Sequence, residues 1–148
     1  MAYYVVPEFD GYVRNNRIIW ETAGEMVYLE PYGKDALRFR ASKSLRIDEE
    51  LNWTLQAPER AGHVQIDVDK ERARIVNGKI TATITGDGTV TYYKTETEEI
   101  LLQEYWIDGR VHTAPLRRAR EYRVTSGDRF QISLYFKEDS GEHFYGMG

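Results

Sequence analysis

The stretch ARIVNGKITATIT, residues 73–85, carries the strongest local signal in the chain. Asn77 and Gly78 at its centre both accept the positive φ angles of a type I′ turn, and apolar residues alternate with polar ones on either side. The stretch therefore predicts a β-hairpin. In its second strand we expect the isoleucines and the alanine to face the core. The residues expected to face solvent are Thr81, Thr83 and Thr85.

Segments with the same alternation lie on both sides of this hairpin, separated by turns rich in Gly, Asn and Asp. Windows with a helical period are scarce. The strands after the hairpin are expected to extend it into a meander, and Asn15-Asn16 predicts a second tight hairpin. The predicted strands are residues 12–14, 17–22, 25–32, 36–42, 64–68, 73–76, 79–85, 89–94, 99–105, 120–124 and 130–137.

Three stretches carry specific expectations about burial. Residues 25–32 have apolar side chains on both faces, which predicts a strand buried on both sides. The stretch 43–58 is the least regular, and Trp53 and Leu55 are expected to anchor it to the core. In the last strand every second residue is apolar, which predicts one inward row. That row is Phe130, Ile132, Leu134 and Phe136.

So many short strands separated by turns predict an all-β fold with little helix. A two-layer antiparallel β-sandwich is expected, since each half-apolar sheet needs a second sheet to cover it. The 148 residues are about the length of one ordinary domain, so residues 1–148 are predicted to form a single domain. Aromatic residues at 13% exceed what a disordered segment carries.

Charge and composition narrow the possible partners. The formal net charge of -4 argues against nucleic acid and anionic lipid, which are bound chiefly by basic surfaces. The chain has no cysteine, which fits a reducing compartment and removes thiolate chemistry. No apolar run is long enough to span a membrane, and the first ten residues lack the pattern of a signal peptide. The cytoplasm is the expected location.

No group of residues predicts a catalytic pair, a metal site or a cofactor site. The acidic runs at 48–50 and 96–99 are expected to be solvated. The histidines His63, His112 and His143 lack metal-site spacing. The basic cluster around Tyr122 is interrupted by Glu121 and is expected to be a solvated strand face or an interdomain surface. Its arginines are Arg117, Arg118, Arg120 and Arg123. Aromatic residues that could stack on sugars, but more often lie in a core, are Trp20, Trp53 and Trp106.

Five stretches, in order along the chain, resemble the N-terminal domain of glycoside hydrolase family 31, the α-glucosidase and α-xylosidase family. They are residues 35–41, 77–82, 101–104 and 130–136, and the closing stretch Phe144, Tyr145, Gly146, Met147 and Gly148. The closing stretch is the most specific, because a similar motif marks the junction between this domain and the next in the family. Together the five stretches span nearly the whole chain.

The resemblance implies a galactose-mutarotase-like β-sandwich that packs against a catalytic (β/α)8 barrel in the same polypeptide. Family members hydrolyse α-glycosidic bonds with retention, using two aspartates on that barrel, which this chain lacks. Trp106-Ile107-Asp108-Gly109 looks like the family's nucleophile motif, but it departs after the aspartate and lies before the junction. The isolated chain is therefore expected to be an inactive support for the barrel, meeting α-linked oligosaccharides only through the parent enzyme.

Two other functions remain open from the sequence. One is an autonomous carbohydrate-binding module that uses exposed tryptophans. The other is an enzyme like the aldose epimerases, which share the implied fold and use a histidine and a carboxylate in one cleft. The placement of the tryptophans and histidines separates these alternatives.

Overall fold

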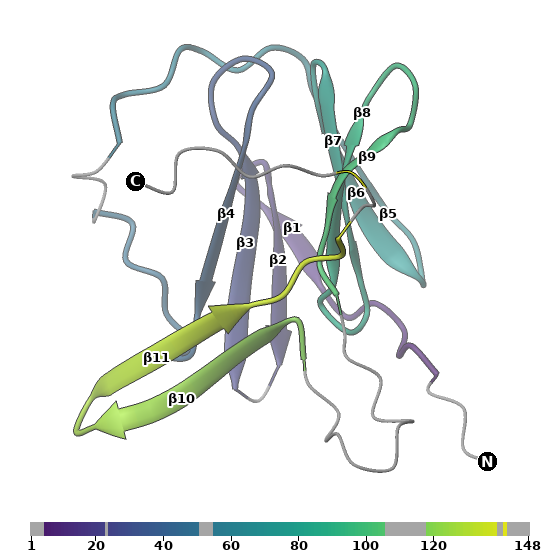
Figure 1. The fold of residues 1–148 in the computed structure, drawn as a ribbon. Helices are drawn as coiled ribbons and strands as arrows, with labels where there is room; N and C mark the ends of the chain where they lie inside the picture. The colour runs from purple at the N-terminus through teal and green to yellow at the C-terminus, as the bar shows by residue number, and fades with distance from the viewer. Residues whose placement is uncertain (1–4, 23, 51–54, 106–117, 139–140, 142–148) are drawn as a thin grey trace. The chain divides into compact units, whose positions relative to one another are not determined.

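The computed structural model describes residues 5–22, 24–50, 55–105, 118–138 and 141. Every regular element in this part of the chain is a β-strand (Figure 1). The strands are β1 (Tyr12–Arg14), β2 (Arg17–Thr22), β3 (Glu25–Pro31), β4 (Leu37–Ser42), β5 (Val64–Val68), β6 (Arg72–Asn77), β7 (Ile80–Thr85), β8 (Val90–Lys94), β9 (Ile100–Gln103), β10 (Arg120–Ser126) and β11 (Arg129–Leu134). None of the described residues forms a helix with the length and apolarity of a membrane span. The all-β prediction is confirmed.

The chain divides into two compact units, Met1–Leu101 and Leu102–Gly148. The first unit contains β1 to β8 and the start of β9. The second contains the end of β9 and the hairpin of β10 and β11. Each unit is described by itself below, and the single domain expected from chain length stays a prediction.

The first unit is built from two antiparallel sheets with simple neighbour topology. One sheet has the order β1-β2-β3-β4, and the other is the predicted meander, β5-β6-β7-β8-β9. Ile18, Trp20, Val27 and Leu29 from the first sheet join Ala73, Ile75, Ala82, Ile84 and Val90 from the second, together with Phe9, in one buried core. Burial of these side chains removes apolar surface from water on both sheets at once. The two predicted layers are therefore present in this unit.

The hairpin of β6 and β7 forms, but its turn differs from the expected one by a residue. Asn77 still pairs with Ile80, so the central residues are Gly78 and Lys79. Gly78 has a φ of 60°, whereas Lys79 has no positive φ, which is the pattern of a type II′ turn and not of type I′. In the β1–β2 hairpin both central residues, Asn15 and Asn16, have positive φ, as predicted.

Asn77 remains in the strand because its side chain links the two sheets. It is fully buried, and its Nδ2 donates hydrogen bonds to the carbonyl oxygens of Gly33, at 2.9 Å, and Ala36, at 2.7 Å. In the same corner the backbone N of Lys79 donates to Asp35 Oδ1 at 2.9 Å. The bond to Gly33 satisfies a buried carbonyl oxygen of the loop between β3 and β4, and the bond to Ala36 adds to the one that its oxygen accepts from Tyr32 N at 3.0 Å.

Strand β3 is buried on both sides, as predicted. Its inward residues lie in the core between the sheets, while Met26 and Tyr28 pack with Ile19 and Ile47 on the outer face. Ile47 comes from the irregular stretch after β4, which thus covers part of the first sheet. Leu55, expected to anchor this stretch, is instead 42% exposed. Among the described residues of this stretch, Ile47 therefore packs on the first sheet in the place expected for Leu55.

Two predicted outward residues of β7 are buried. Thr81 is 1% exposed and Thr83 is 5% exposed, although both lie on the face away from the core. Because β7 is the central strand of its sheet, longer side chains of its neighbours flank them: Tyr93 lies opposite Thr81, and Arg74 lies opposite Thr83. Alternation located the face correctly but could not show that it was covered.

The second unit is organised around β10 and β11, which pair antiparallel across a turn where Gly127 has a φ of 56°. Backbone bonds join the residues after β11 to the end of β9 and the residues after it: Tyr105 N donates to Tyr135 O at 2.9 Å, and Lys137 N donates to Gln103 O at 2.8 Å. The predicted inward row is wrong. Its members are exposed: Phe130 44%, Ile132 59%, Leu134 50% and Phe136 41%.

We expect Asn77→Ala to lower the free energy of unfolding by about 2 kcal/mol, because two hydrogen bonds are lost and the buried carbonyl oxygen of Gly33 is left without its donor. Urea unfolding followed by circular dichroism would measure the change. Gln65→Ala, at an exposed position on the neighbouring strand β5, is the control and should change the free energy by less than about 0.5 kcal/mol. Equal changes in the two variants would contradict the bridging role of Asn77.

Candidate functional site

Several residues singled out in the sequence lie outside the described part of the chain. They include the whole predicted junction, Phe144, Tyr145, Gly146, Met147 and Gly148, whose role stays a prediction. Trp53, Trp106, Asp108, His112, Arg117 and His143 also lie outside it. The candidate sites below are built from described residues only.

The buried carboxylates of the described residues are Glu25, Glu30 and Glu104. Glu30 and Glu104 each form an ion pair with arginine, whereas glycoside hydrolysis requires two carboxyl groups that flank the scissile bond. No group of three or more metal-ligating side chains gathers among the described residues. We interpret the ion pairs of Glu30 and Glu104 as structural.

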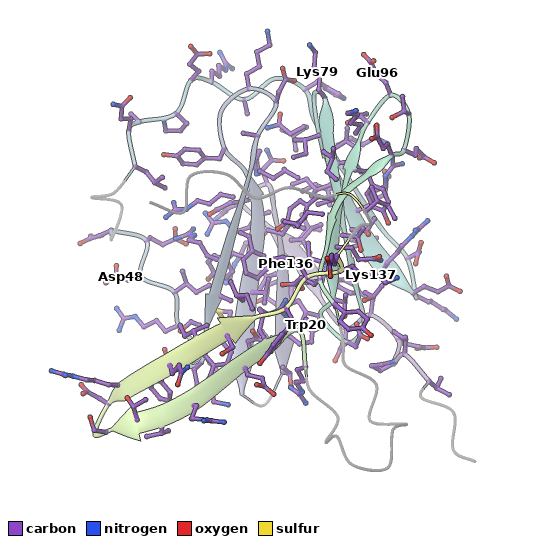
Figure 2. All side chains as sticks on the ribbon, in the orientation of Figure 1. Trp20, Asp48, Lys79, Glu96, Phe136 and Lys137 are labelled. Atoms are coloured by element: carbon purple, nitrogen blue, oxygen red, sulfur yellow. The ribbon has the colours of Figure 1, made fainter. Side chains whose placement is uncertain are left out.

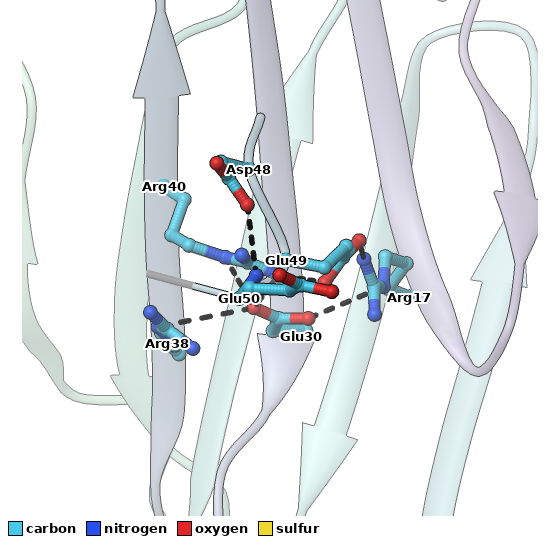
Figure 3. A network of polar contacts seen from close by, with 7 residues as sticks. All are labelled: Arg17, Glu30, Arg38, Arg40, Asp48, Glu49 and Glu50. Atoms are coloured by element: carbon cyan, nitrogen blue, oxygen red, sulfur yellow. Dashed lines mark hydrogen bonds and ion pairs between the residues drawn. The ribbon is translucent and has the colours of Figure 1, made fainter. Parts of the chain in front are cut away.

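Five charged residues form a network on the outer face of the first sheet (Figure 3). Glu30 of β3 is its centre: Arg40 Nη2 lies 2.7 Å and Arg17 Nε 3.2 Å from its carboxylate, and Arg38 Nε lies at 4.0 Å. The pairing of β3 with β4 places Arg38 directly opposite Glu30. Glu49, from the stretch after β4, bridges Arg17 and Arg40. We call these residues the arginine–glutamate network.

Tyr28 supports the network from beneath. The guanidinium carbons of Arg17 and Arg40 lie 4.9 and 5.3 Å from its ring centroid, within the range of cation–π attraction. Along β4, Arg38 and Arg40 lie on this outer face, whereas Phe39 packs against the core. The acidic run 48–50 was expected to be solvated. In the structure Glu49 bonds two arginines, and Asp48 accepts a hydrogen bond from the backbone N of Glu50 at 2.9 Å.

The network shifts the pKa values of its members. Burial alone would raise the pKa of Glu49, but hydrogen bonds and charge from Arg17 and Arg40 outweigh it and lower the pKa below its usual value. For Arg17, burial alone would lower the pKa, and Glu49 and Glu30 outweigh it, so the pKa is raised. The Glu49 carboxylate and the Arg17 guanidinium are therefore each stabilised in the charged form. The network ties the stretch after β4 to the sheet and is poorly suited to proton transfer.

Other candidate residues have structural surroundings. Trp20 is 5% exposed and its Nε1 donates to Gly86 O at 3.1 Å, so it belongs to the core and cannot stack on a ligand. His63 is exposed. Within the basic cluster, Arg118 and Arg123 are exposed as expected. Arg120 is not, because it forms a buried ion pair with Glu104, with both side chains 4% exposed.

Exposed apolar side chains follow one another along β11 and continue to Phe136, which Figure 2 labels. Val124 of β10 lies opposite Phe130 and adds to it, with 62% exposure. The intervening residues Gln131 and Ser133 point to the other, polar face. We call Val124, Phe130, Ile132, Leu134 and Phe136 the β11 apolar face. The buried pair of Glu104 and Arg120 adjoins it, since Arg120 lies opposite Leu134 and Glu104 opposite Phe136.

The pH dependence of stability in a Glu49 variant tests the arginine–glutamate network. Because folding lowers the pKa of Glu49 from about 4.5, its stabilisation is complete above that value and is lost as pH falls through the lower folded value. We expect Glu49→Gln to lower the free energy of unfolding by about 0.5 kcal/mol at neutral pH, discounted because the side chain is half exposed. The difference from the parent chain should vanish in acid. Urea unfolding at neutral and acidic pH would measure both.

Glu50→Gln is the matched control, since Glu50 is also exposed and shows no ion pair within the described ranges. It should leave stability nearly unchanged at both pH values. A loss in Glu49→Gln that persists unchanged in acid would contradict a charge-based role.

Comparisons with known proteins extend these observations. No protein-family model matches the chain. An uncharacterized family 31 glucosidase of Pseudescherichia vulneris is 29% identical over 146 residues, which cover 90% of this chain and 27% of the relative. Among solved structures, a GH31 α-xylosidase from a soil metagenome, complexed with xylose, matches with a TM-score of 0.77 and 25% identity. That match covers 89% of this chain and 21% of the α-xylosidase.

The chain therefore spans about a quarter of the length of these relatives, 27% of one and 21% of the other. Both matches extend over nearly the whole of this chain, as the ordered motifs of the sequence indicated. The two comparisons confirm that this chain resembles part of the glycoside hydrolase family 31 enzymes.

Proposed function

We propose that this chain is the non-catalytic N-terminal β-sandwich domain of a retaining α-glycosidase and supports the catalytic barrel of the same polypeptide. The observation that carries the proposal is the β11 apolar face. Its side chains are 41–62% exposed, whereas an ordinary soluble surface scatters such residues singly. A contiguous apolar face opposite a polar one is typical of a surface that a further part of a protein covers.

The occupant we propose is the remainder of a longer polypeptide. The chain spans about a quarter of each relative, so a comparable enzyme has a large further part that could cover this face. The face is also well supported: β10 and β11 are paired along their length, and the buried Glu104–Arg120 pair holds the hairpin to the preceding chain. Such preorganisation reduces the entropy lost when a surface is covered.

In this proposal the catalytic residues lie outside the 148-residue chain. The family resemblance assigns catalysis to two aspartates of the barrel, and the buried Glu30 and Glu104 are neutralised by arginines. The names of the relatives favour an α-glucoside or α-xyloside as the substrate of the parent enzyme. A cytoplasmic location accompanies the proposal, since a chain without cysteine suits a reducing compartment.

An autonomous carbohydrate-binding module remains the alternative, but the version that uses exposed tryptophans loses support at Trp20, which is buried and bonded to Gly86. An epimerase-like enzyme has only the exposed His63 to offer among the described histidines. Neither alternative accounts for the β11 apolar face.

The isolated chain is expected to have no glycosidase activity. The purified 148-residue chain should release no nitrophenol from aryl α-glucosides or α-xylosides above the rate in buffer, because it lacks the two barrel aspartates. Turnover that is abolished by replacing a single carboxylate of this chain would overturn the proposal. Turnover that no such replacement removes would identify a contaminating enzyme and leave the expected inactivity intact.

A substitution at Ile132 tests docking through the β11 apolar face. Ile132→Thr should change the stability of the isolated chain by less than about 0.5 kcal/mol, since Ile132 is already exposed. In the longer polypeptide encoded by the full reading frame, the same substitution removes a buried contact worth about 1.5–3 kcal/mol. Its melting temperature should therefore fall there and not in the isolated chain.

Gln131→Thr, on the opposite face of the same strand, is the matched control and should affect neither protein. Equal melting temperatures for the two variants of the longer polypeptide would contradict docking through the β11 apolar face. A reading frame without a long continuation after residue 148 would also contradict the proposal.

A further inference from the structure

A small polar pocket lies on the outer face of the second sheet, within the first unit. Its volume is about 110 Å³, and it is lined by Arg72, Arg74, Thr83, Tyr93 and Glu98. These residues come from β6, β7, β8 and the turn before β9. None of them belongs to the arginine–glutamate network or to the β11 apolar face. The pocket is therefore a separate feature that the proposed function does not use.

The strand pattern explains why these side chains converge. Ala73 and Ile75 of β6 lie in the core, so the arginines on either side of Ala73 emerge on the outer face. Arg74 lies directly opposite Thr83, and Thr83 is 5% exposed, which makes it the floor. Tyr93 pairs with Thr81, one step along the same face, and its half-buried ring forms a wall.

Glu98 closes the pocket from the turn between β8 and β9. It has a φ of 56°, a conformation that costs free energy for a residue with a side chain. The turn is held by backbone bonds from Glu98 N to Lys94 O and from Lys94 N to Glu99 O, both 2.9 Å. This backbone brings the Glu98 carboxylate to 3.4 Å from Arg74 Nη2. That contact is exposed and long, so little free energy opposes its rearrangement around a ligand.

The charges around the pocket are mixed in sign, with two arginines among three carboxylates. Arg72, Arg74 and Glu98 line the pocket, and Asp67 lies opposite Arg74 on β5. Asp69, in the turn before β6, also interacts electrostatically with Arg72. An anion would gain little attraction here and would meet carboxylates at close range. The pocket instead presents guanidinium donors, a carboxylate acceptor and two hydroxyl groups that can do both.

We propose that this pocket binds the hydroxyl edge of a neutral sugar. Each sugar hydroxyl donates and accepts a hydrogen bond, which suits a polar lining that offers both donors and acceptors. A pocket of about 110 Å³ is smaller than the roughly 300–1,000 Å³ that cofactors and drug-sized ligands occupy, so it admits one edge of one sugar unit. Binding is accordingly weak, in the millimolar range.

This inference goes beyond the proposed function and does not depend on docking through β11. A domain that supports a barrel can also hold a second sugar unit of a polymeric substrate, on a surface without catalytic groups. Failure of one idea leaves the other intact, because the pocket and the apolar face lie on different strands and have different readouts.

The test is a titration of the ¹⁵N-labelled 148-residue chain, followed by amide and arginine side-chain resonances. The probes are methyl α-glucoside and methyl α-xyloside, compared with glucuronate and inorganic phosphate. We expect the neutral sugars to shift the signals of Thr83, Tyr93 and Glu98 in a saturable manner. Absence of saturable shifts with both neutral sugars, or shifts with the anions alone, would overturn the inference.

Variants separate this pocket from adventitious binding. Thr83→Val removes the floor hydroxyl with little change of shape, and Arg74→Met removes a donor while keeping an extended side chain. Each should weaken sugar binding about fivefold, the loss expected for roughly one hydrogen bond. Arg129→Met, an exposed arginine on β11 outside the pocket, should leave binding unchanged.

If either variant unfolds, as loss of dispersion in its NMR spectrum would show, Tyr93→Leu replaces it in the test. Tyr93 is only half buried, so its replacement is less disruptive to the fold. Titrations that are the same in every folded pocket variant and in Arg129→Met would also refute the pocket as the binding site.

Discussion

The packing of two sheets face to face is the constraint on which the first unit depends. Ile18, Val27 and Leu29 on one sheet, and Ile75 and Ile84 on the other, are almost completely excluded from water. Because each sheet is apolar on its inner face, neither is stable without the other. Asn77 adds direction to this otherwise non-directional contact, since its two hydrogen bonds reach the β3–β4 loop from β6. The apolar core supplies the free energy, and Asn77 helps to select one relative placement of the sheets.

Local chemistry in the sequence was enough to predict the strands and most of their neighbours. Alternation identified β1 to β11 within a few residues, and Asn15-Asn16 identified the hairpin between β1 and β2. Asn77-Gly78 identified a hairpin but not its turn, because a distant loop uses the Asn77 side chain. Alternation also assigns residues to faces without showing what covers each face. For that reason Thr83 was expected to be exposed and is buried, while Ile132 was expected to be buried and is exposed.

The candidate sites were harder to predict for the same physical reason. The arginine–glutamate network joins Arg17, Glu30 and Glu49, which are separated in sequence and meet only when the stretch after β4 folds over the sheet. The acidic run that contains Glu49 looks like any solvated run, and only its contact with two arginines distinguishes it. The pocket at Thr83 likewise depends on the positive φ of Glu98, which no residue type in that turn predicts. Long-range placement, not residue chemistry, was the missing information.

The outer surfaces differ in a way that bears on their roles. The network face of the first sheet is covered by ion pairs between arginine and glutamate, so an anionic ligand would have to replace a carboxylate that is already paired. The β11 apolar face differs from the network face, because its contact with water is unfavourable in free energy. A complementary apolar surface that covers it removes this unfavourable hydration. The pocket near Thr83 lies between these limits, with polar groups that water satisfies equally well. A ligand must therefore form several hydrogen bonds at once to displace this water. A rigid polyol loses less conformational entropy in doing so than a flexible chain, and so suits the pocket better.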